Sequence, residues 1–181
     1  TPLTSIMGYA QALRDGTVSD DASMRRAGDV IFAESQRMTR LVTDLLYLSQ
    51  LDARSVALAS TSLDLAAIAR DSTETLPATA VERGIAVRLD APEFAGALGD
   101  ANAVRQVVYK LVDNACRYST EGSETVVSVR AGDESARLSV SSAGVPPGGV
   151  ERLFERFYRP DPTNGNGTGL GLAISRELVT A

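Results

Sequence analysis

An apolar repeat of seven residues in the first third of the chain constrains the fold more than any other feature. The repeat consists of Met24, Ile31, Met38 and Leu45, with Ala27, Leu41 and Leu48 at the companion positions and Glu34 as the exception. This pattern predicts a long helix from about residue 20 to 53 with a coiled-coil seam. A shorter helical pattern runs from Pro2 to a stop signal at Asp15 and Gly16. Two helices cannot bury such a stripe alone, so we expect residues 1–54 to form a hairpin that pairs with a second copy in a four-helix bundle.

The remainder of the chain mixes strand and helix patterns. Residues 55–61 are predicted to be a linker, followed by a second domain at residues 62–181. The predicted strands lie at 63–65, 85–89, 124–130 and 136–141, and the predicted helices at 66–83, after the capping residue Asp100, and from about 168. This order predicts an α+β fold whose second part is an α/β sandwich, with one mixed sheet covered by helices.

Composition excludes several classes of protein. The chain has 18 basic and 23 acidic residues and a net charge of −5, which argues against a general binder of nucleic acid or of membrane surfaces. The single cysteine, Cys116, excludes an intrachain disulfide and a thiolate-rich zinc site. The chain contains no His, so it holds no Ser-His-Asp triad and no imidazole metal site of its own. No apolar run reaches the ~18 residues that a membrane span needs. Because helical patterns run into both ends, we expect the chain to be part of a longer protein.

Glycines at alternating positions directly precede the last predicted helix. They occupy positions 165, 167, 169 and 171, with Thr168 and Leu170 between the last three. Because glycine has no Cβ, backbone N–H groups can converge on an anion, and the N-terminus of the following helix adds a favourable partial charge. The spacing differs from that of a Lys-ended P-loop, and no strand immediately precedes it as in a dinucleotide fold. Gly167, Gly169 and Gly171 therefore predict a phosphate site, with a flexible connector as the alternative.

The helix that follows Asp100 carries a second candidate group near its C-terminal end. Asn114 lies beside the small residue Ala115, and its neutral oxygen could complete a magnesium shell supplied by phosphates and water. Arg117 could pair with phosphate, and Tyr118 could pack on a base. The alternative is a helix end with solvated polar residues.

A third segment, at residues 151–159, contains two phenylalanines that are three residues apart. Phe154 and Phe157 would share one face of a helix. There they could be part of the core, anchor a mobile lid, or do both.

Four segments together carry a family resemblance. They are Leu-Thr-Ser-Ile after Thr-Pro, the Asn114-Ala115 helix, the run Leu-Phe-Glu-Arg-Phe-Tyr-Arg, and Gly-Thr-Gly-Leu-Gly-Leu-Ala-Ile. In this order they resemble bacterial sensor histidine kinases, and the resemblance covers essentially the whole chain. It implies that residues 1–54 are the dimerisation and phosphotransfer hairpin. It also implies that residues 62–181 are the ATP-binding domain shared with gyrase and Hsp90-type ATPases.

The resemblance implies a mechanism and its participants. ATP would bind between the Asn114 helix and the glycine segment, with magnesium bridging its phosphates to Asn114. The γ-phosphoryl group would pass to a His and then to an Asp in the receiver domain of a response regulator. The family pattern His-Glu-x-x-Thr-Pro would place the acceptor His four residues before Thr1, and Thr1 would help to dephosphorylate the partner. The chain would then be the cytoplasmic part of a bacterial inner or cell membrane protein, attached to the membrane only through segments outside it.

The chain also departs from the family pattern. The acceptor His and its acidic neighbour are absent. The family's Asp-x-Gly-x-Gly motif aligns with Val140, Ser142 and Gly144, so the carboxylate that binds the adenine amino group is lost, at a cost of about 1–3 kcal/mol. Lys110 stands where an Asn is common, and it could compete with magnesium or pair with phosphate. The lid at Pro160–Asn166 is short, and the family's last pair of strands is missing, which would leave a sheet edge uncovered.

Two functional hypotheses follow from this comparison. In the first, the chain is the ATP-dependent kinase core of a sensor histidine kinase with a divergent adenine pocket. In the second, it is a degenerate kinase that binds ATP weakly or not at all and acts as a dimeric scaffold or phosphatase. The first is preferred because the glycine segment, Asn114 and Arg117 are intact, and phosphate contacts contribute much of nucleotide affinity. A related ATPase or anti-sigma kinase would fit the second domain but not the helical hairpin.

Overall fold

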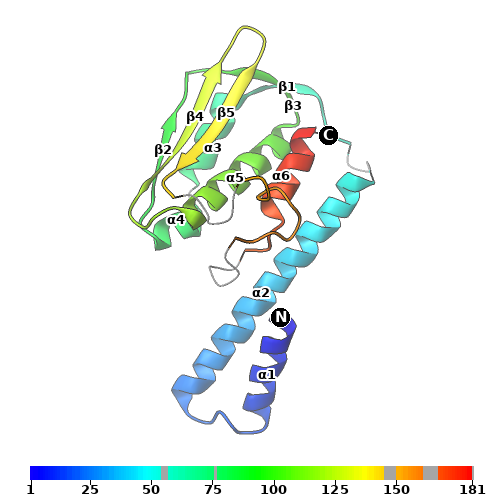
Figure 1. The fold of residues 1–181 in the computed structure, drawn as a ribbon, viewed down its shortest axis with the longest axis vertical. Helices are drawn as coiled ribbons and strands as arrows, with labels where there is room; N and C mark the ends of the chain where they lie inside the picture. Colours follow the sequence, from blue (N-terminus) through cyan, green and yellow to red (C-terminus); the bar gives the residue numbers. More distant parts are fainter. Residues whose placement is uncertain (54–56, 76, 145–149, 161–166, 181) are drawn as a thin grey trace.

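The computed structural model describes residues 1–53, 57–75, 77–144, 150–160 and 167–180. It begins with a hairpin of two helices, α1 (Pro2–Arg14) and α2 (Asp21–Asp52), which lie side by side in Figure 1. Thr1 caps α1, and the carboxylate of Asp20 caps α2 by accepting the N–H of Ser23 at 2.9 Å. The predicted helical hairpin is therefore confirmed. No helix in the described part of the chain is long and apolar enough to cross a membrane.

The apolar side chains of the hairpin, including the heptad seam of α2, are only partly covered within one copy of the chain. Ala27 and Leu48 are buried, but Leu45 is 53% exposed. Several other large apolar side chains of the hairpin are more than half exposed, namely Leu3, Met7, Phe32, Val42 and Leu46. An apolar surface of this kind on a helical pair favours association with another helical surface.

The second part of the chain combines helices and short strands. Its elements are β1 (Thr61–Asp64), α3 (Leu65–Glu74), α4 (Ala78–Glu82), β2 (Ala86–Asp90), β3 (Gly96–Gly99), α5 (Ala101–Tyr118), β4 (Glu124–Ala131), β5 (Ala136–Ser142) and α6 (Gly171–Thr180). Strands β1 and β3 form an antiparallel pair. In a separate sheet, β4 pairs with β2 in parallel and with β5 in antiparallel orientation. The mixed α+β fold is confirmed, with two small sheets in place of the single sheet that the sequence predicts.

Strand β3 is the element that the sequence analysis missed. Its four residues are Gly-Ala-Leu-Gly, which contain one large apolar side chain and no alternating pattern. Leu98 is exposed, so its hydrophobicity does not direct it toward the core. The strand exists because its backbone pairs with β1, from Thr61 opposite Gly99 to Asp64 opposite Gly96.

The helix predicted at residues 66–83 is divided into α3 and α4. Helix α3 ends at Glu74, and α4 begins at Ala78, directly after Pro77. Proline has no N–H to donate and disfavours helical geometry at the preceding residue, so one continuous helix cannot form there. Gly84 ends the segment with a φ of +61°, as the sequence predicts.

The helical geometry predicted for residues 151–159 is also wrong. The described residues 150–158 form turns, and the last helix begins at Gly171 instead of about 168. Phe157 and Gly169 both have positive φ angles, 64° and 73°, which an α-helix does not allow. Phe154 and Phe157 are exposed, so neither belongs to the core.

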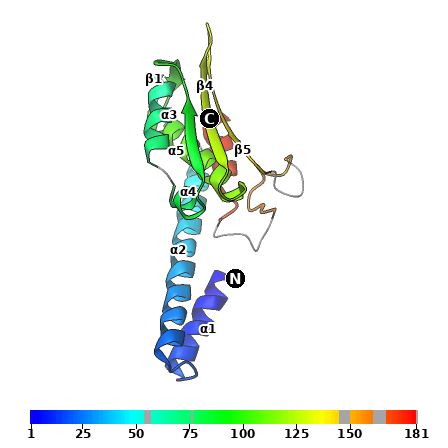
Figure 2. The ribbon, with the colours of Figure 1, turned by 90° about the vertical axis from the view of Figure 1, so that its left-hand side faces the viewer.

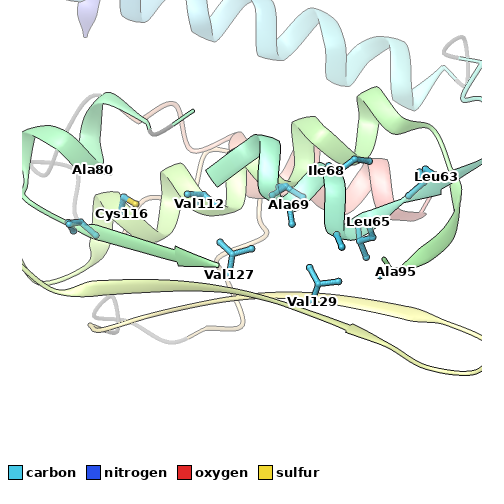
Figure 3. Close-up of a cluster of buried hydrophobic side chains, with 13 residues drawn as sticks. Leu63, Leu65, Ile68, Ala69, Ala80, Ala95, Val112, Cys116, Val127 and Val129 are labelled. Carbon is cyan, nitrogen blue, oxygen red and sulfur yellow. The ribbon is translucent and has the colours of Figure 1, made fainter. Parts of the chain in front are cut away.

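The main core lies between the three-stranded sheet and helices α3 and α5. Figure 2 shows these helices on one face of the sheet. Thr125, Val127 and Val129 alternate along β4 and are fully buried toward the helices. Val127 and Val129 belong to one apolar cluster with Val112 and Cys116, which are one turn apart on α5 (Figure 3). Burial raises the pKa of the Cys116 thiol, which keeps it protonated as a small apolar group.

Removing two methyl groups from the centre of this core tests how much α5 depends on it. Val112 is 0% exposed, whereas Val81 on α4 is 72% exposed. We expect Val112→Ala to lower the free energy of unfolding by about 2 kcal/mol, because it removes apolar contacts and leaves a cavity. Val81→Ala should change it by less than about 0.5 kcal/mol. Denaturant unfolding followed by circular dichroism measures both, and equal effects would contradict the core assignment.

Candidate functional site

A cavity of about 530 Å³ is lined by segments that lie far apart in the sequence. Most of the lining comes from the middle of α2, the C-terminal half of α5 and residues 167–172, with smaller contributions from the start of α4 and from residues 153–160. Most of the predicted site residues line it: Lys110, Asn114, Arg117, Tyr118, Gly167, Thr168, Gly169 and Gly171. The volume lies in the range of pockets that hold small molecules and cofactors. The structure therefore brings the two main sequence motifs together around one space.

Helix α5 presents its polar residues to the cavity from successive turns. Arg117 donates a hydrogen bond to the carboxylate of Asp113 at 3.0 Å. The other oxygen of Asp113 accepts the hydroxyl of Thr79, also at 3.0 Å. The half-buried side chain of Asn114 has no hydrogen-bond partner among the described residues, so its amide oxygen is available to a ligand.

Arg83 fixes the end of α5 from outside the cavity. Its guanidinium donates to the carbonyl oxygens of Cys116, Arg117 and Ser119, which the helix itself leaves without partners. The sequence analysis missed this residue, although a basic side chain directly before a turn glycine is a weak signal for such a role. Arg83 thereby holds the helical turn from which Arg117 and Tyr118 reach the cavity.

The glycine segment is shaped by contact with the phenylalanine segment. The N–H of Phe157 donates to the carbonyl of Gly169 at 2.9 Å. A Cβ at Gly169 would lie 2.8 Å from the carbonyl carbon of Phe157, and the φ of +73° is itself unfavourable for other residues. Gly169 is therefore required by close packing of two backbones, whatever else it binds.

The residues that follow Gly169 orient α6 toward the cavity. Leu170 is fully buried with Ile174 in a second apolar cluster and does not line the cavity. Gly171 and Leu172, in the first turn of α6, do line it. The N–H groups at the start of a helix and its dipole favour anions, so this end of the cavity is suited to phosphate. Gly165 and most of the lid predicted at 160–166 lie outside the described residues.

Helix α2 forms another wall of the cavity and contributes a carboxylate. One oxygen of Asp44 accepts from the ammonium of Lys110 at 3.1 Å, and the other accepts from the hydroxyl of Thr168 at 3.0 Å. Lys110 is the only lysine in the sequence. The sequence analysis missed Asp44. The one local signal for this residue is its charge and its position on α2, one turn before the buried Leu48.

Two further contacts attach α2 to the second part of the chain. Leu48 is 2% exposed and packs in the same apolar cluster as Leu170 and Ile174. At the end of α2, Arg156 donates to both carboxylate oxygens of Asp52, at 2.7 and 2.8 Å. The hydrogen bonds from Arg156 lower the pKa of Asp52. Figure 1 shows this upper part of α2 beside α6.

The structure places the other predicted site residues away from the cavity lining. Thr1 is exposed at the start of α1, where it caps that helix. Gly144 has a φ of +108°, and a Cβ there would lie 2.9 Å from the carbonyl oxygen of Tyr118, so it packs against the end of α5. Val140 and Ser142 are paired within the β4–β5 ladder, opposite Val127 and Thr125. The loop at 145–149 lies outside the described residues.

Comparison with known proteins gives two family matches. Residues 1–54 match the His Kinase A (phospho-acceptor) domain. Residues 99–181 match the histidine kinase-, DNA gyrase B- and HSP90-like ATPase family. The two matches lie in the order in which the hairpin and the cavity-bearing domain occur along the chain.

Curated relatives and a solved structure agree with these matches. The sensor histidine kinase CusS of Escherichia coli O6:H1 is 32% identical, over 100% of this chain and 38% of CusS. The sensor histidine kinase WalK of Bacillus subtilis is 31% identical, over 100% of this chain and 31% of WalK. The chain thus spans about a third of the length of these relatives. The histidine kinase AdeS of Acinetobacter baumannii shares the fold, with a TM-score of 0.76, 24% identity, and coverage of 99% of this chain and 84% of AdeS.

Two glycines of the cavity should respond differently to an added methyl group. We expect Gly169→Ala to destabilise the protein by about 1–3 kcal/mol, because it combines a positive φ with a clash against the Phe157 backbone. Gly171→Ala meets no atom within 4 Å and lies in a helix, so it should be neutral or stabilise by up to about 1 kcal/mol. Thermal unfolding without nucleotide measures both variants. Equal destabilisation would contradict the described contact.

Proposed function

Because this chain belongs to the sensor histidine kinases, we propose that it is the kinase core that passes the γ-phosphoryl group of ATP to a histidine and then to a response-regulator aspartate. The observation that carries this proposal is the cavity at which Asn114, the glycine segment and the start of α6 meet beside the hairpin. Sensor kinase relatives match over the full chain, which favours an active kinase over a degenerate scaffold.

In the proposed complex, the phosphates of ATP lie at the glycine segment. The N–H groups from Gly167 to Gly171 and the start of α6 provide donors and a favourable dipole. Arg117, held in the cavity by Asp113, adds a positive charge within reach of the phosphates. Positioning and charge stabilisation of this kind are the main contributions of a protein to phosphoryl transfer.

Asn114 is the proposed protein ligand of a magnesium ion that accompanies ATP. Its amide oxygen is half-buried, lines the cavity and has no hydrogen-bond partner among the described residues. Magnesium prefers oxygen ligands and usually takes few from the protein, so phosphates and water can supply the rest. When bound, the ion neutralises charge on the phosphates, and Asn114 orients it relative to α5.

The adenine side of the site is expected to bind weakly. Neither Val140 nor Ser142 offers the carboxylate that the family pattern provides, and neither lines the cavity. Tyr118, Leu153 and Tyr158 do line it, so we propose that the base packs on these side chains. The two carboxylates of the lining, Asp44 and Asp113, already accept hydrogen bonds from Thr168 and Thr79.

The hairpin is the proposed site of dimerisation and phosphotransfer. Its exposed apolar side chains would be buried by a second copy of the hairpin. The chain contains no His, so the phosphorylated residue must lie outside these 181 residues. Thr1 is proposed to assist dephosphorylation of the receiver domain of the response regulator. We propose that the parent protein is a bacterial membrane sensor and that this region lies on its cytoplasmic side.

Nucleotide binding should depend on the neutral amide of Asn114. In Asn114→Asp the added carboxylate repels the phosphates, so we expect Mg·ATP binding to be lost at millimolar nucleotide. Asn102→Asp is the matched control, because Asn102 is exposed at the other end of α5 and does not line the cavity. Isothermal titration calorimetry measures both. Binding by Asn114→Asp at the wild-type affinity would refute the proposed magnesium site.

The kinase activity itself is tested in a longer protein that contains this chain and an acceptor histidine. We expect incorporation of phosphate from ATP that is acid-labile, as phosphohistidine is. The Asn114→Asp variant should incorporate none, and the Asn102→Asp variant should incorporate the normal amount. A folded wild-type protein that binds ATP but never becomes phosphorylated would favour the scaffold hypothesis.

The hairpin should make the chain a dimer at micromolar concentration. Phe32 is 66% exposed on α2, next to the seam residue Ile31, and a charge there should oppose burial of the exposed apolar surface of the hairpin. We expect multi-angle light scattering to give twice the 19.1 kDa chain mass for the wild type. For Phe32→Asp we expect the measured mass to shift toward that of a single chain. The control Val81→Asp, which is exposed outside the hairpin, should remain dimeric. A monomeric wild type would overturn the dimer proposal.

A further inference from the structure

We propose that Asp44 of the hairpin helix α2 sets the nucleotide affinity of the cavity by competing with nucleotide phosphate for Lys110 and Thr168. The inference rests on the proposed function and adds to it a residue outside the ATPase-like segment. When a nucleoside triphosphate binds, the Asp44 carboxylate gives up these two partners to the phosphates.

The contacts of Asp44 are those expected of a phosphate group. Its two oxygens accept from an ammonium, Lys110, and from a hydroxyl, Thr168, at 3.1 and 3.0 Å. All three residues line the cavity in which the nucleotide is proposed to bind. A cation and a hydroxyl next to a helix N-terminus bind any oxyanion, so the carboxylate and a phosphate oxygen compete for the same donors.

The two cations that α5 contributes to the cavity lining, Lys110 and Arg117, differ in where their partners come from. Arg117 is paired with Asp113, one turn away on the same helix, and keeps that partner wherever α2 lies. Lys110 is paired with Asp44, which belongs to the other part of the chain. The side chains of Lys110 and Asp44 are only 18% and 19% exposed, so water screens the pair incompletely. A triphosphate brought to Lys110 would therefore repel the Asp44 carboxylate at close range.

Asp44 also belongs to the surface by which α2 contacts the rest of the chain. Asp44, Leu48 and Asp52 are spaced by four residues and lie on one face of α2. Leu48 is buried against α6, and Asp52 is bound by Arg156. Because two linked equilibria affect each other by the same factor, a nucleotide that displaces Asp44 must weaken this docking as much as docking weakens nucleotide binding.

The decisive experiment uses titration calorimetry to compare the affinities for Mg·AMPPNP of variants in which one aspartate is replaced by the uncharged asparagine. We expect Asp44→Asn to bind Mg·AMPPNP at least about threefold more tightly than the wild type, because the variant lacks the ion pair that competes with the phosphates for Lys110 and even exposed ion pairs contribute this much. Asp29→Asn removes the same charge from an exposed position of α2 outside this cavity and should bind like the wild type. Equal or weaker binding by Asp44→Asn would overturn the inference.

A further variant separates competition inside the cavity from simple loosening of α2. Asp52→Asn breaks the contact with Arg156 without changing a residue of the cavity lining. Competition at Lys110 predicts that Asp52→Asn tightens nucleotide binding less than Asp44→Asn does. If the two variants tighten it equally, undocking alone explains the effect and direct competition is refuted.

The single lysine provides a readout that does not depend on affinity. In protein whose lysine is ¹³C-labelled at Cε, the single Cε NMR signal reports on Lys110. We expect that signal to shift in nucleotide-free Asp44→Asn and on addition of Mg·AMPPNP to the wild type, but not in nucleotide-free Asp29→Asn. A signal that Asp44→Asn leaves unchanged would overturn the contact.

Failure of this inference and failure of the proposed function give different results. Nucleotide binding with identical affinities for the wild type and Asp44→Asn refutes the inference and leaves the proposed function intact. The absence of nucleotide binding in every variant refutes the proposed function and, with it, the inference.

Discussion

The burial of one face of α5 is the constraint on which the rest of the structure depends. Val108, Val112 and Cys116 follow one another at intervals of four residues and are almost fully buried. Because a helix is rigid over this length, burying that face against β4 fixes the direction of the opposite, polar face. Lys110 and Asn114 therefore face the cavity without any loop having to position them. Arg83 completes this arrangement by binding the carbonyl groups at the end of the helix.

The elements that the sequence predicts well are those whose pattern is local. Helices α2 and α5 and strands β4 and β5 carry a period of their own, and their caps and turns are short-range signals. The four-residue strand β3 has no such signal, because it depends on pairing with β1 more than thirty residues away. The turns at residues 150–158 likewise depend on the contact between Phe157 and Gly169. The break at Pro77 differs, since the proline itself is a local signal that a helix ends there.

In the candidate site, too, some features follow from local sequence patterns and others from contacts between distant segments. The motif residues Asn114 and Thr168 lie in one cavity, as the family resemblance implies. The role of Gly169 could not be deduced from its motif, because the atoms that exclude a Cβ belong to Phe157. Asp44 could not be found from sequence for a related reason. Its partner Lys110 is 66 residues away, and only the packing of α2 against α6 brings the two together.

The charges of the cavity also explain what a lysine changes at position 110. Lys110 and Arg117 each face a carboxylate of the protein, so the cavity without ligand contains compensated ion pairs. When a phosphate replaces the Asp44 carboxylate, Lys110 stays paired with an anion. A neutral ligand cannot replace the carboxylate in this way, so it would leave the pair of Lys110 and Asp44 in place. An asparagine, which is common at this position in the family, could still donate to the Asp44 carboxylate but would carry no positive charge, so no ion pair would form. Lysine thus makes the contact between the hairpin and the ATPase-like domain dependent on the charge of whatever enters the cavity.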